Sequence, residues 1–216
     1  MKTDKSRYKL LILLVLTDFF FIVLHIFHKY TDFGPGRLLS IDQDMGFAEM
    51  FQYIKEYWIG LMLLWLALKR RSFLFFGWSL MFFYLLFDDA LMFHESGGTI
   101  LTRYFNLQPI LGLRAQDIGE LGIAVIVGVA FLAIIGISHY FSEQRLREIS
   151  KRIAILLVAL VFFGVFVDMI HSMFRKTEIS NLLALIEDGG EMVVMSLITW
   201  YVFKIDQESL AGDELK

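Results

Sequence analysis

The chain alternates between long apolar runs and short polar segments. About 20 consecutive apolar residues are enough for a helix to cross the hydrocarbon core of a bilayer. Six runs reach this length, at residues 10–27, 47–68, 72–94, 117–141, 152–174 and 181–203. The pattern predicts an all-α integral membrane protein with six transmembrane helices in a compact bundle. The connections are short, so we expect a single transmembrane domain over residues 1–216.

Composition supports this class of protein. Of the 216 residues, 57% are hydrophobic, and the mean hydropathy is +0.61, which is typical of a membrane protein. The N-terminal apolar run resembles a signal peptide, but no small-residue cleavage site follows it and Asp18 interrupts it. We therefore interpret it as an uncleaved first span. The chain has no cysteine, which excludes disulfides and thiolate metal sites.

Basic residues predict the orientation in the membrane, because Lys and Arg are enriched in cytoplasmic loops. Most of them lie at alternate ends of the spans, near residues 2–9, 69–71, 145–152 and 204–216. Both termini should therefore be cytoplasmic, in a bacterial-type inner (plasma) membrane, with loops 28–46, 95–116 and 175–180 outside. The basic stretches are explained by topology, so we expect the lipid bilayer and no nucleic acid as a partner. The pattern predicts no particular oligomer or protein partner.

Acidic and histidine side chains gather at one depth of this predicted bundle. Apart from Asp18, which lies near the middle of the first span, the acids within the spans fall in their outer halves, as do His25, His94 and His171. A charge at the bilayer centre costs about 3 kcal/mol on insertion scales, so many acids facing lipid would be prohibitive. They should instead face one another or a water-filled pocket. Crowded carboxylates at low dielectric must bind protons or cations.

Helical spacing places several of these residues on shared faces. Asp168 and His171 are three apart, Glu187 and Glu191 four apart, and Asp88 and Glu95 seven apart. Carboxylates and imidazoles that converge from several helices are the ligands of di-metal bundles. The candidate ligands of one or two divalent metal ions are Asp89, His94, Glu95, Glu120, Asp168, His171, Glu187 and Glu191. Further acids of the pocket are Glu49, Glu56, Asp88, Asp117 and Asp188, and Lys55 and Arg114 are candidates for binding an anionic group.

Three similar segments suggest an internal repeat. They read QDMGFAEM at 43–50, QDIGEL at 116–121 and EDGGEM at 187–192. We hypothesise three helical hairpins related by an axis along the membrane normal, at residues 9–71, 72–142 and 151–204. Helix capping explains part of the similarity, because Asp117 with Glu120, and Asp188 with Glu191, have the N-cap and N3 spacing. Capping does not explain the acids at the outer ends of the third and fifth spans.

Three functions fit this pattern. The first is a membrane metalloenzyme that acts on a lipid-linked or small periplasmic substrate, with a metal-activated water and a spare carboxylate as base. The second is a divalent-cation or proton-coupled transporter, since acids within membranes mark ion pathways. The third is a non-catalytic assembly subunit in which the polar cluster only organises the helices. The inner halves of the spans, almost purely apolar, argue against a transport pathway without excluding it.

Overall fold

The computed structural model describes residues 2–31 and 36–213. Its elements are α1 (Lys2–Thr31), the 3-10 helix η1 (Gly36–Leu39), α2 (Phe47–Arg70), α3 (Phe73–Leu91), α4 (Phe93–Phe105), α5 (Ala115–Tyr140), α6 (Gln144–Val161), the π-helix η2 (Phe162–Val167), α7 (Asp168–Phe174) and α8 (Ser180–Asp213). One continuous helix, Gln144–Phe174, contains α6, η2 and α7. The prediction of an all-α protein is confirmed.

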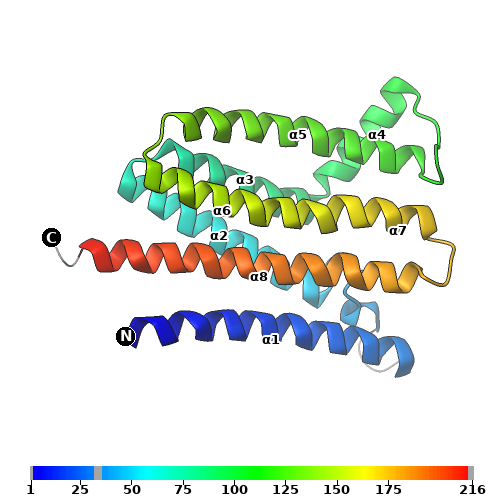
Figure 1. Cartoon of the computed structure of the whole chain (residues 1–216). Coiled ribbons are helices and arrows are strands. Elements are labelled where there is room, and N and C mark those ends of the chain that lie inside the picture. Colours follow the sequence, from blue (N-terminus) through cyan, green and yellow to red (C-terminus); the bar gives the residue numbers. More distant parts are fainter. Residues whose placement is uncertain (1, 32–35, 214–216) are drawn as a thin grey trace.

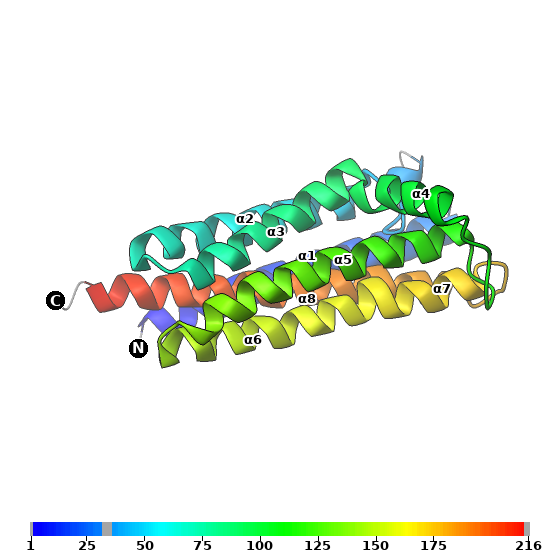
Figure 2. The same cartoon turned by 90° about the horizontal axis from the view of Figure 1, so that it is seen from above.

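The long helices lie alongside one another in an up-and-down bundle (Figure 1). The start of α1 and the end of α8 lie at one end, which we call the terminal end, and α4 lies at the other, the α4 end. Seen from above, α2 and α3 lie together on one side of the bundle and α6 and α7 on the other (Figure 2). The chain therefore brings the start of α5, the end of α7 and the start of α8 to the α4 end.

The predicted number of spans is corrected by the structure. Four helices of its described part are long and apolar enough to cross a membrane, at Tyr8–Thr31, Phe73–Leu91, Ala115–Tyr140 and Gln144–Phe174, and not six. The difference lies in α2 and α8, which have sufficient length but carry many charged residues. Lys55 and Glu56 of α2 are fully buried, so the bundle encloses these charges. By length and composition, these four helices suggest a multi-pass membrane protein.

A tightly packed apolar core joins α2, α3, α6 and α8. Ile59, Phe75, Ile153 and Ile198 have at most 1% of their surface exposed. Trp78 is buried beside them, and its Nε1 donates a hydrogen bond of 2.9 Å to Ser150 Oγ on α6. A buried indole N–H needs such a partner. Burial of these side chains holds α2 and α8 in the bundle despite their charges.

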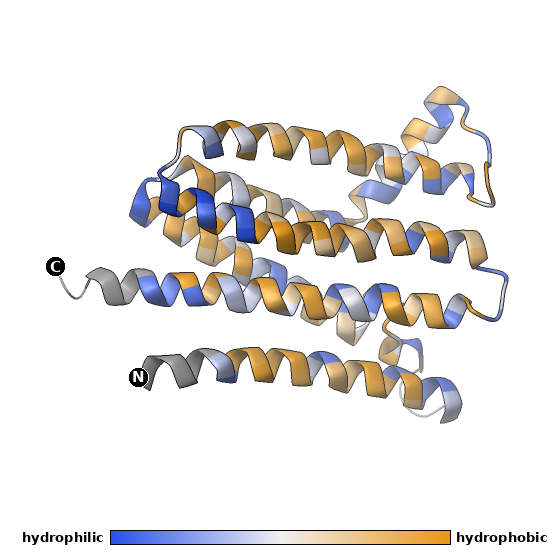
Figure 3. Cartoon of the chain, in the orientation of Figure 1, coloured by the Kyte–Doolittle hydropathy of each residue, from blue (hydrophilic) through white to orange (hydrophobic). Residues whose placement is uncertain are grey.

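The outward surfaces of α1 and α5 are apolar along most of their length (Figure 3). Leu13 and Phe19 on α1 are 62% and 61% exposed, and Val129 and Leu132 on α5 are 61% and 68% exposed. Continuous exposed apolar surface of this kind is rare on soluble monomers and marks contact with lipid or another apolar partner. The burial pattern therefore supports embedding of these helices in a membrane.

Two predicted boundaries are wrong because of a break at Met92. The run 72–94 is not one helix: α3 ends at Leu91, and Met92 has the left-handed φ of 53°. The chain then turns into α4, where a loop from 95 to 116 was predicted. Asp88 and Glu95 therefore lie on different helices and share no helical face. The break moves His94 from the end of a span to the first turn of α4.

Of the two acids that were interpreted as helix caps, Asp117 takes part in capping at a different position and Asp188 does not cap a helix. Arg114 is the N-cap of α5, and Asp117 is its N3 residue, whose carboxylate accepts the Arg114 backbone N–H at 2.8 Å. Asp117 was predicted to be the N-cap itself. Asp188 lies well inside α8, which begins at Ser180, so helix capping does not explain its position.

The hairpin repeat stays a prediction. The contacts of α1 are mainly with α8, whereas α2 packs most extensively against α3. Furthermore, α4 is inserted between α3 and α5 and packs along α5. The three proposed hairpins thus differ in how their two helices contact each other.

Candidate metal centre

The predicted pocket residues lie on the helix portions nearest the α4 end (Figure 1). Two groups of three stand out, because in each of them one ligand atom from every residue lies within 4.8 Å of the others. The first triad is Asp88, Asp89 and His94, and the second triad is Asp168, His171 and Glu187. Five of these six residues were predicted as metal ligands, and the sixth, Asp88, was predicted as a further acid of the pocket.

The first triad is formed where α3 turns into α4. His94 Nδ1 lies 3.2 Å from Asp88 Oδ2, and the Tyr84 hydroxyl donates to Asp88 Oδ1 at 3.1 Å. The hydrogen bond from Asp88 outweighs the effect of burial and raises the pKa of His94 from 6.5 to about 9. The left-handed backbone conformation of Met92 brings His94 to Asp88, because it folds the first turn of α4 back onto the end of α3.

We expect the stability of metal-depleted protein to depend on this ion pair. A folded-state pKa above the unfolded value stabilises the protein most at pH values below the unfolded pKa. The contribution of His94 should therefore be complete below pH 6.5 and be lost as the pH rises towards 9. Chemical unfolding of wild type and His94→Gln between pH 6 and 9.5 measures it. A constant stability difference between the two proteins across that range would contradict the assignment.

Glu56 of α2 adds a third carboxyl group to the first triad. Its side chain is hydrogen-bonded to that of Asp89, and Glu56 is 1% exposed. Two ionised carboxylates cannot form such a bond, so the pair shares a proton. The other oxygen, Oε2, is buried and has no hydrogen-bond partner in the described part of the chain. A buried carboxyl oxygen without a partner is costly unless a proton or cation occupies the site.

The second triad joins α7 to α8. His171 Nδ1 lies 2.7 Å from Glu187 Oε2, and His171 Nε2 lies 3.1 Å from Ser180 Oγ. The Glu187 side chain is also hydrogen-bonded to Asp168. The i, i+3 spacing that predicted Asp168 and His171 on one face therefore brings them to a common partner. A metal ion at this triad would replace one of the two imidazole contacts.

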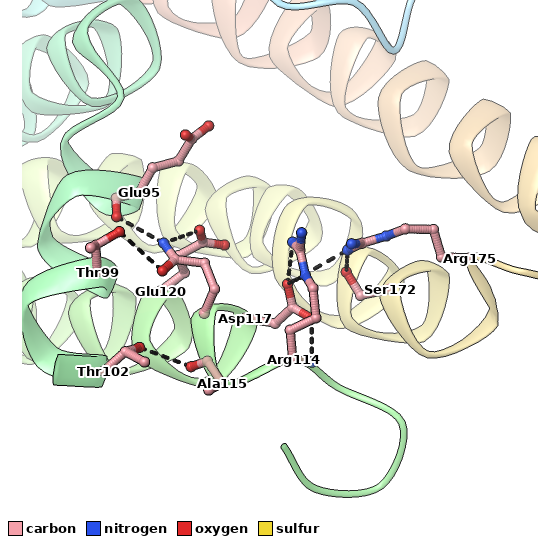
Figure 4. Close-up of polar contacts among 10 residues, drawn as sticks. Glu95, Thr99, Thr102, Arg114, Ala115, Asp117, Glu120, Ser172 and Arg175 are labelled. Atoms are coloured by element: carbon pink, nitrogen blue, oxygen red, sulfur yellow. Dashed lines mark hydrogen bonds and ion pairs between the residues drawn. The ribbon is translucent and has the colours of Figure 1, made fainter. Parts of the chain in front are cut away.

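Glu120 lies between the two triads. It interacts electrostatically with both His94 and Asp168. Gln116 Nε2 orients it by donating to Glu120 Oε1 at 2.8 Å and to the Glu95 carbonyl at 2.9 Å (Figure 4). The Glu95 carboxylate itself turns away from this network (Figure 4), and Glu95 belongs to neither triad.

Glu191 is the second residue between the triads. It interacts electrostatically with Asp89 on one side and with Glu187 and Asp168 on the other. Its Oε1 lies over Gly164, where a Cβ atom would approach it to 2.5 Å. Gly164 belongs to the π-helix η2, and such local widening of a helix often accompanies functional sites. The π-helix therefore leaves room for a carboxylate in the centre of the α4 end.

The remaining predicted residues have other contacts. Glu49 accepts a hydrogen bond from the Met45 backbone N–H, and Asp117 forms an ion pair with Arg114. Asp188 faces Asp42, Asp168 and Glu49 electrostatically. Lys55 lies in the core, so we keep the prediction of an anionic-group site for Arg114, whose side chain is 58% exposed.

A buried ion pair was not predicted from the sequence. Lys55 Nζ lies 3.0 Å from Asp18 Oδ1, and both side chains are completely buried. The ammonium also donates to the Met192 carbonyl at 2.8 Å, and Ser196 Oγ donates to Asp18 Oδ2 at 2.5 Å. A signal was present, because Asp18 and Lys55 are a solitary acid and a solitary base within apolar runs.

Comparison with known proteins identifies a family for this chain, but no individual curated protein or solved structure. No curated protein and no solved structure matches the chain. Residues 11–205, which include both triads and the buried ion pair, match a family described as a domain of unknown function, DUF8692. The chain belongs to this family, DUF8692.

Proposed function

We propose that the protein is a membrane metalloenzyme that binds one or two divalent metal ions at the α4 end. The observation that carries the proposal is the pair of triads, each with two carboxylates and one imidazole that converge within 4.8 Å. Metal–oxygen and metal–nitrogen bonds are roughly 2.0–2.2 Å long, so ligand atoms of one ion lie at most about 4.4 Å apart. Small side-chain movements would bring either triad into this range.

The ligand type restricts the metal. Mixed carboxylate and imidazole sites suit zinc, iron and manganese, whereas calcium and magnesium prefer oxygen alone. A divalent ion would offset the two carboxylates of a triad. When bound, such an ion lowers the pKa of its water and supplies a nucleophile. Glu120, which lies between the triads and is oriented by Gln116, is our choice for the general base.

Basic residues support an orientation for this site. Arg70 is the last residue of α2 and Arg71 follows it, and Arg145 and Arg147 lie at the start of α6. Both groups lie at the terminal end, which by the positive-inside rule would face the cytoplasm. The α4 end would then open to the outer side of a bacterial-type inner membrane, where a lipid-linked or small periplasmic substrate could reach the triads.

Elemental analysis of the purified protein in detergent tests the proposal. We expect wild type to retain up to two equivalents of a divalent transition metal, and His94→Ala and His171→Ala each to lose about one. His139→Ala is the matched control, because His139 lies at the terminal end of α5 and should not change the metal content. Folded wild-type protein that takes up no metal when supplied with zinc, iron or manganese would refute the proposal.

One observation favours transport as the second candidate function. The carboxyl groups of Asp89 and Glu56 share a proton, and Lys55 and Asp18 follow at the centre of the bundle. This buried polar series extends inwards from the first triad. Uptake of a radiolabelled divalent cation or of protons by proteoliposomes would support transport, and intact metal binding without any flux would favour the enzyme.

A further inference from the structure

Two arginine side chains are held together at the α4 end by a single carboxylate. Arg114 donates to Asp117 Oδ1 from Nε at 2.9 Å and from Nη2 at 2.6 Å. Arg175 Nη2 lies 3.5 Å from the same oxygen and donates to Ser172 Oγ at 2.8 Å. Figure 4 shows both guanidinium groups converging on Asp117, Arg114 from the N-cap of α5 and Arg175 from the C-cap of α7. Asp117 is 4% exposed, but the two arginines are 58% and 42% exposed.

This arginine pair has one more charge than the acid that it contacts directly, while Glu120 and Asp168 interact electrostatically with Arg114 without an ion pair. One carboxylate faces two guanidinium groups, which leaves one positive charge. Glu120 is hydrogen-bonded by Gln116, and Asp168 is hydrogen-bonded to Glu187. Neither acid has an ion pair with Arg114 or Arg175 among the described residues. The exposed guanidinium groups therefore retain N–H donors suited to bidentate phosphate binding.

An apolar groove begins one helical turn below the arginine pair. It has a volume of about 540 Å³ and lies between α5 and the continuous helix of α6, η2 and α7. Leu121 lines one wall, four residues after Asp117, and Met169 lines the other, three residues before Ser172. Both walls thus continue along the helix faces that carry Asp117 and Ser172, which contact the arginine pair.

The length of the groove matches one leaflet of a bilayer. Its lining residues on the second wall extend from Val158 to Met169, a rise of about 16 Å at 1.5 Å per residue. This is close to half of the roughly 30 Å hydrocarbon core. Val158 is 69% and Phe162 is 48% exposed, so the groove opens outwards from the bundle.

We propose that this groove and the arginine pair form a binding site for an anionic phospholipid in the leaflet at the α4 end. The phosphate contacts Arg114 and Arg175, and an acyl chain lies in the groove between Leu121 and Val158. The positive guanidinium groups favour a lipid with an anionic head group. The apolar walls of the groove favour a lipid over a free phosphate ion. The site shares no residue with the two triads, although Arg175 interacts electrostatically with the second triad, and the proposal does not require that they bind metal.

Native mass spectrometry of protein exchanged into detergent with added lipid tests the proposal. We expect wild type to retain phosphatidylglycerol over phosphatidylcholine, and Arg114→Gln/Arg175→Gln to retain about tenfold less phosphatidylglycerol, since charge-assisted hydrogen bonds are lost. Arg103→Gln is the matched control, because Arg103 is an exposed arginine of α4. Equal retention of phosphatidylglycerol by wild type and the double variant would overturn the proposal.

Two further variants separate lipid binding from folding and from phosphate binding. Arg114→Lys/Arg175→Lys keeps both charges and should recover part of the lipid retention, which a purely structural role of the arginines would not predict. Leu121→Trp fills the groove and should reduce retention of phosphatidylglycerol with the arginines intact. If Leu121→Trp has no effect and inorganic phosphate displaces the lipid, the site binds a phosphate ion and the lipid proposal is wrong.

Discussion

Lys55→Met is expected to destabilise the protein by about 3–5 kcal/mol, the loss typical of removing one partner of a buried ion pair. The variant leaves the Asp18 carboxylate in the apolar centre of the bundle with Ser196 as its remaining partner. Asp18 and Lys55 are both 0% exposed, so water cannot replace the lost ammonium. The loss should appear in the free energy of unfolding, measured in mixed micelles by tryptophan fluorescence.

Two further variants define what this loss means. Lys151→Met removes an ion pair of similar length, 2.9 Å to Glu148, whose side chains are 56% and 51% exposed; it should change stability little because solvent screens it. Asp18→Leu/Lys55→Met removes both buried charges and should recover most of the stability. If Lys55→Met behaved like Lys151→Met, the ion pair would not be buried as the structure has it.

The ion pair of Lys55 with Asp18 lies next to the carboxyl groups of the α4 end. Lys55 interacts electrostatically with Glu56 and Glu191, in addition to Asp18. It is therefore the positive charge at the base of the acid-rich α4 end. Without it, the carboxyl groups nearest the core would have to bind more protons. The same residue thus stabilises α1, α2 and α8 against one another and limits the negative charge below the triads.

Hydrophobic periodicity predicted the helices well, because a long apolar run has few other stable structures in a membrane. It could not decide the number of spans. Six runs reach the length of a span, but the charged residues of α2 and α8 leave four helices that are apolar enough to cross a membrane. Lys55 of α2 is instead paired with Asp18 inside the bundle. Whether a charged helix such as α2 is enclosed by its neighbours depends on tertiary packing, which a single sequence does not reveal.

The residues of the candidate site could largely be predicted from the sequence, whereas their arrangement in space could be predicted only in part. The spacing of Asp168 and His171 placed them on one face of a helix, and they lie together in the second triad. The first triad depends on the turn at Met92, a non-glycine residue with positive φ. Sequence gives no strong signal for such a turn. For this reason the contact of His94 with Asp88 was not foreseen.

Gly119→Ala is expected to destabilise the protein by about 1–3 kcal/mol, the usual effect of overpacking a tight interface. Gly119 lies where α5 crosses α4, and a Cβ atom there would overlap the Gly98 carbonyl oxygen and Thr102 Oγ1. The carbonyl belongs to the helix backbone, so it cannot move without α4 as a whole. Small residues at helix crossings allow such close approach in membrane proteins.

The effect of Gly119→Ala should extend to the first triad, because α4 carries His94. Displacement of α4 lengthens the 3.2 Å contact between His94 and Asp88, so the pKa of His94 should fall from about 9 towards 6.5. Gly128→Ala is the matched control on the same helix, since its Cβ would meet nothing within 4 Å. Alanine there should stabilise the helix by up to about 1 kcal/mol and leave the His94 titration, followed by NMR, unchanged. Were both variants to titrate alike, α4 would not be positioned by its contact with Gly119, and the geometry of the first triad would have to depend on the Met92 turn alone.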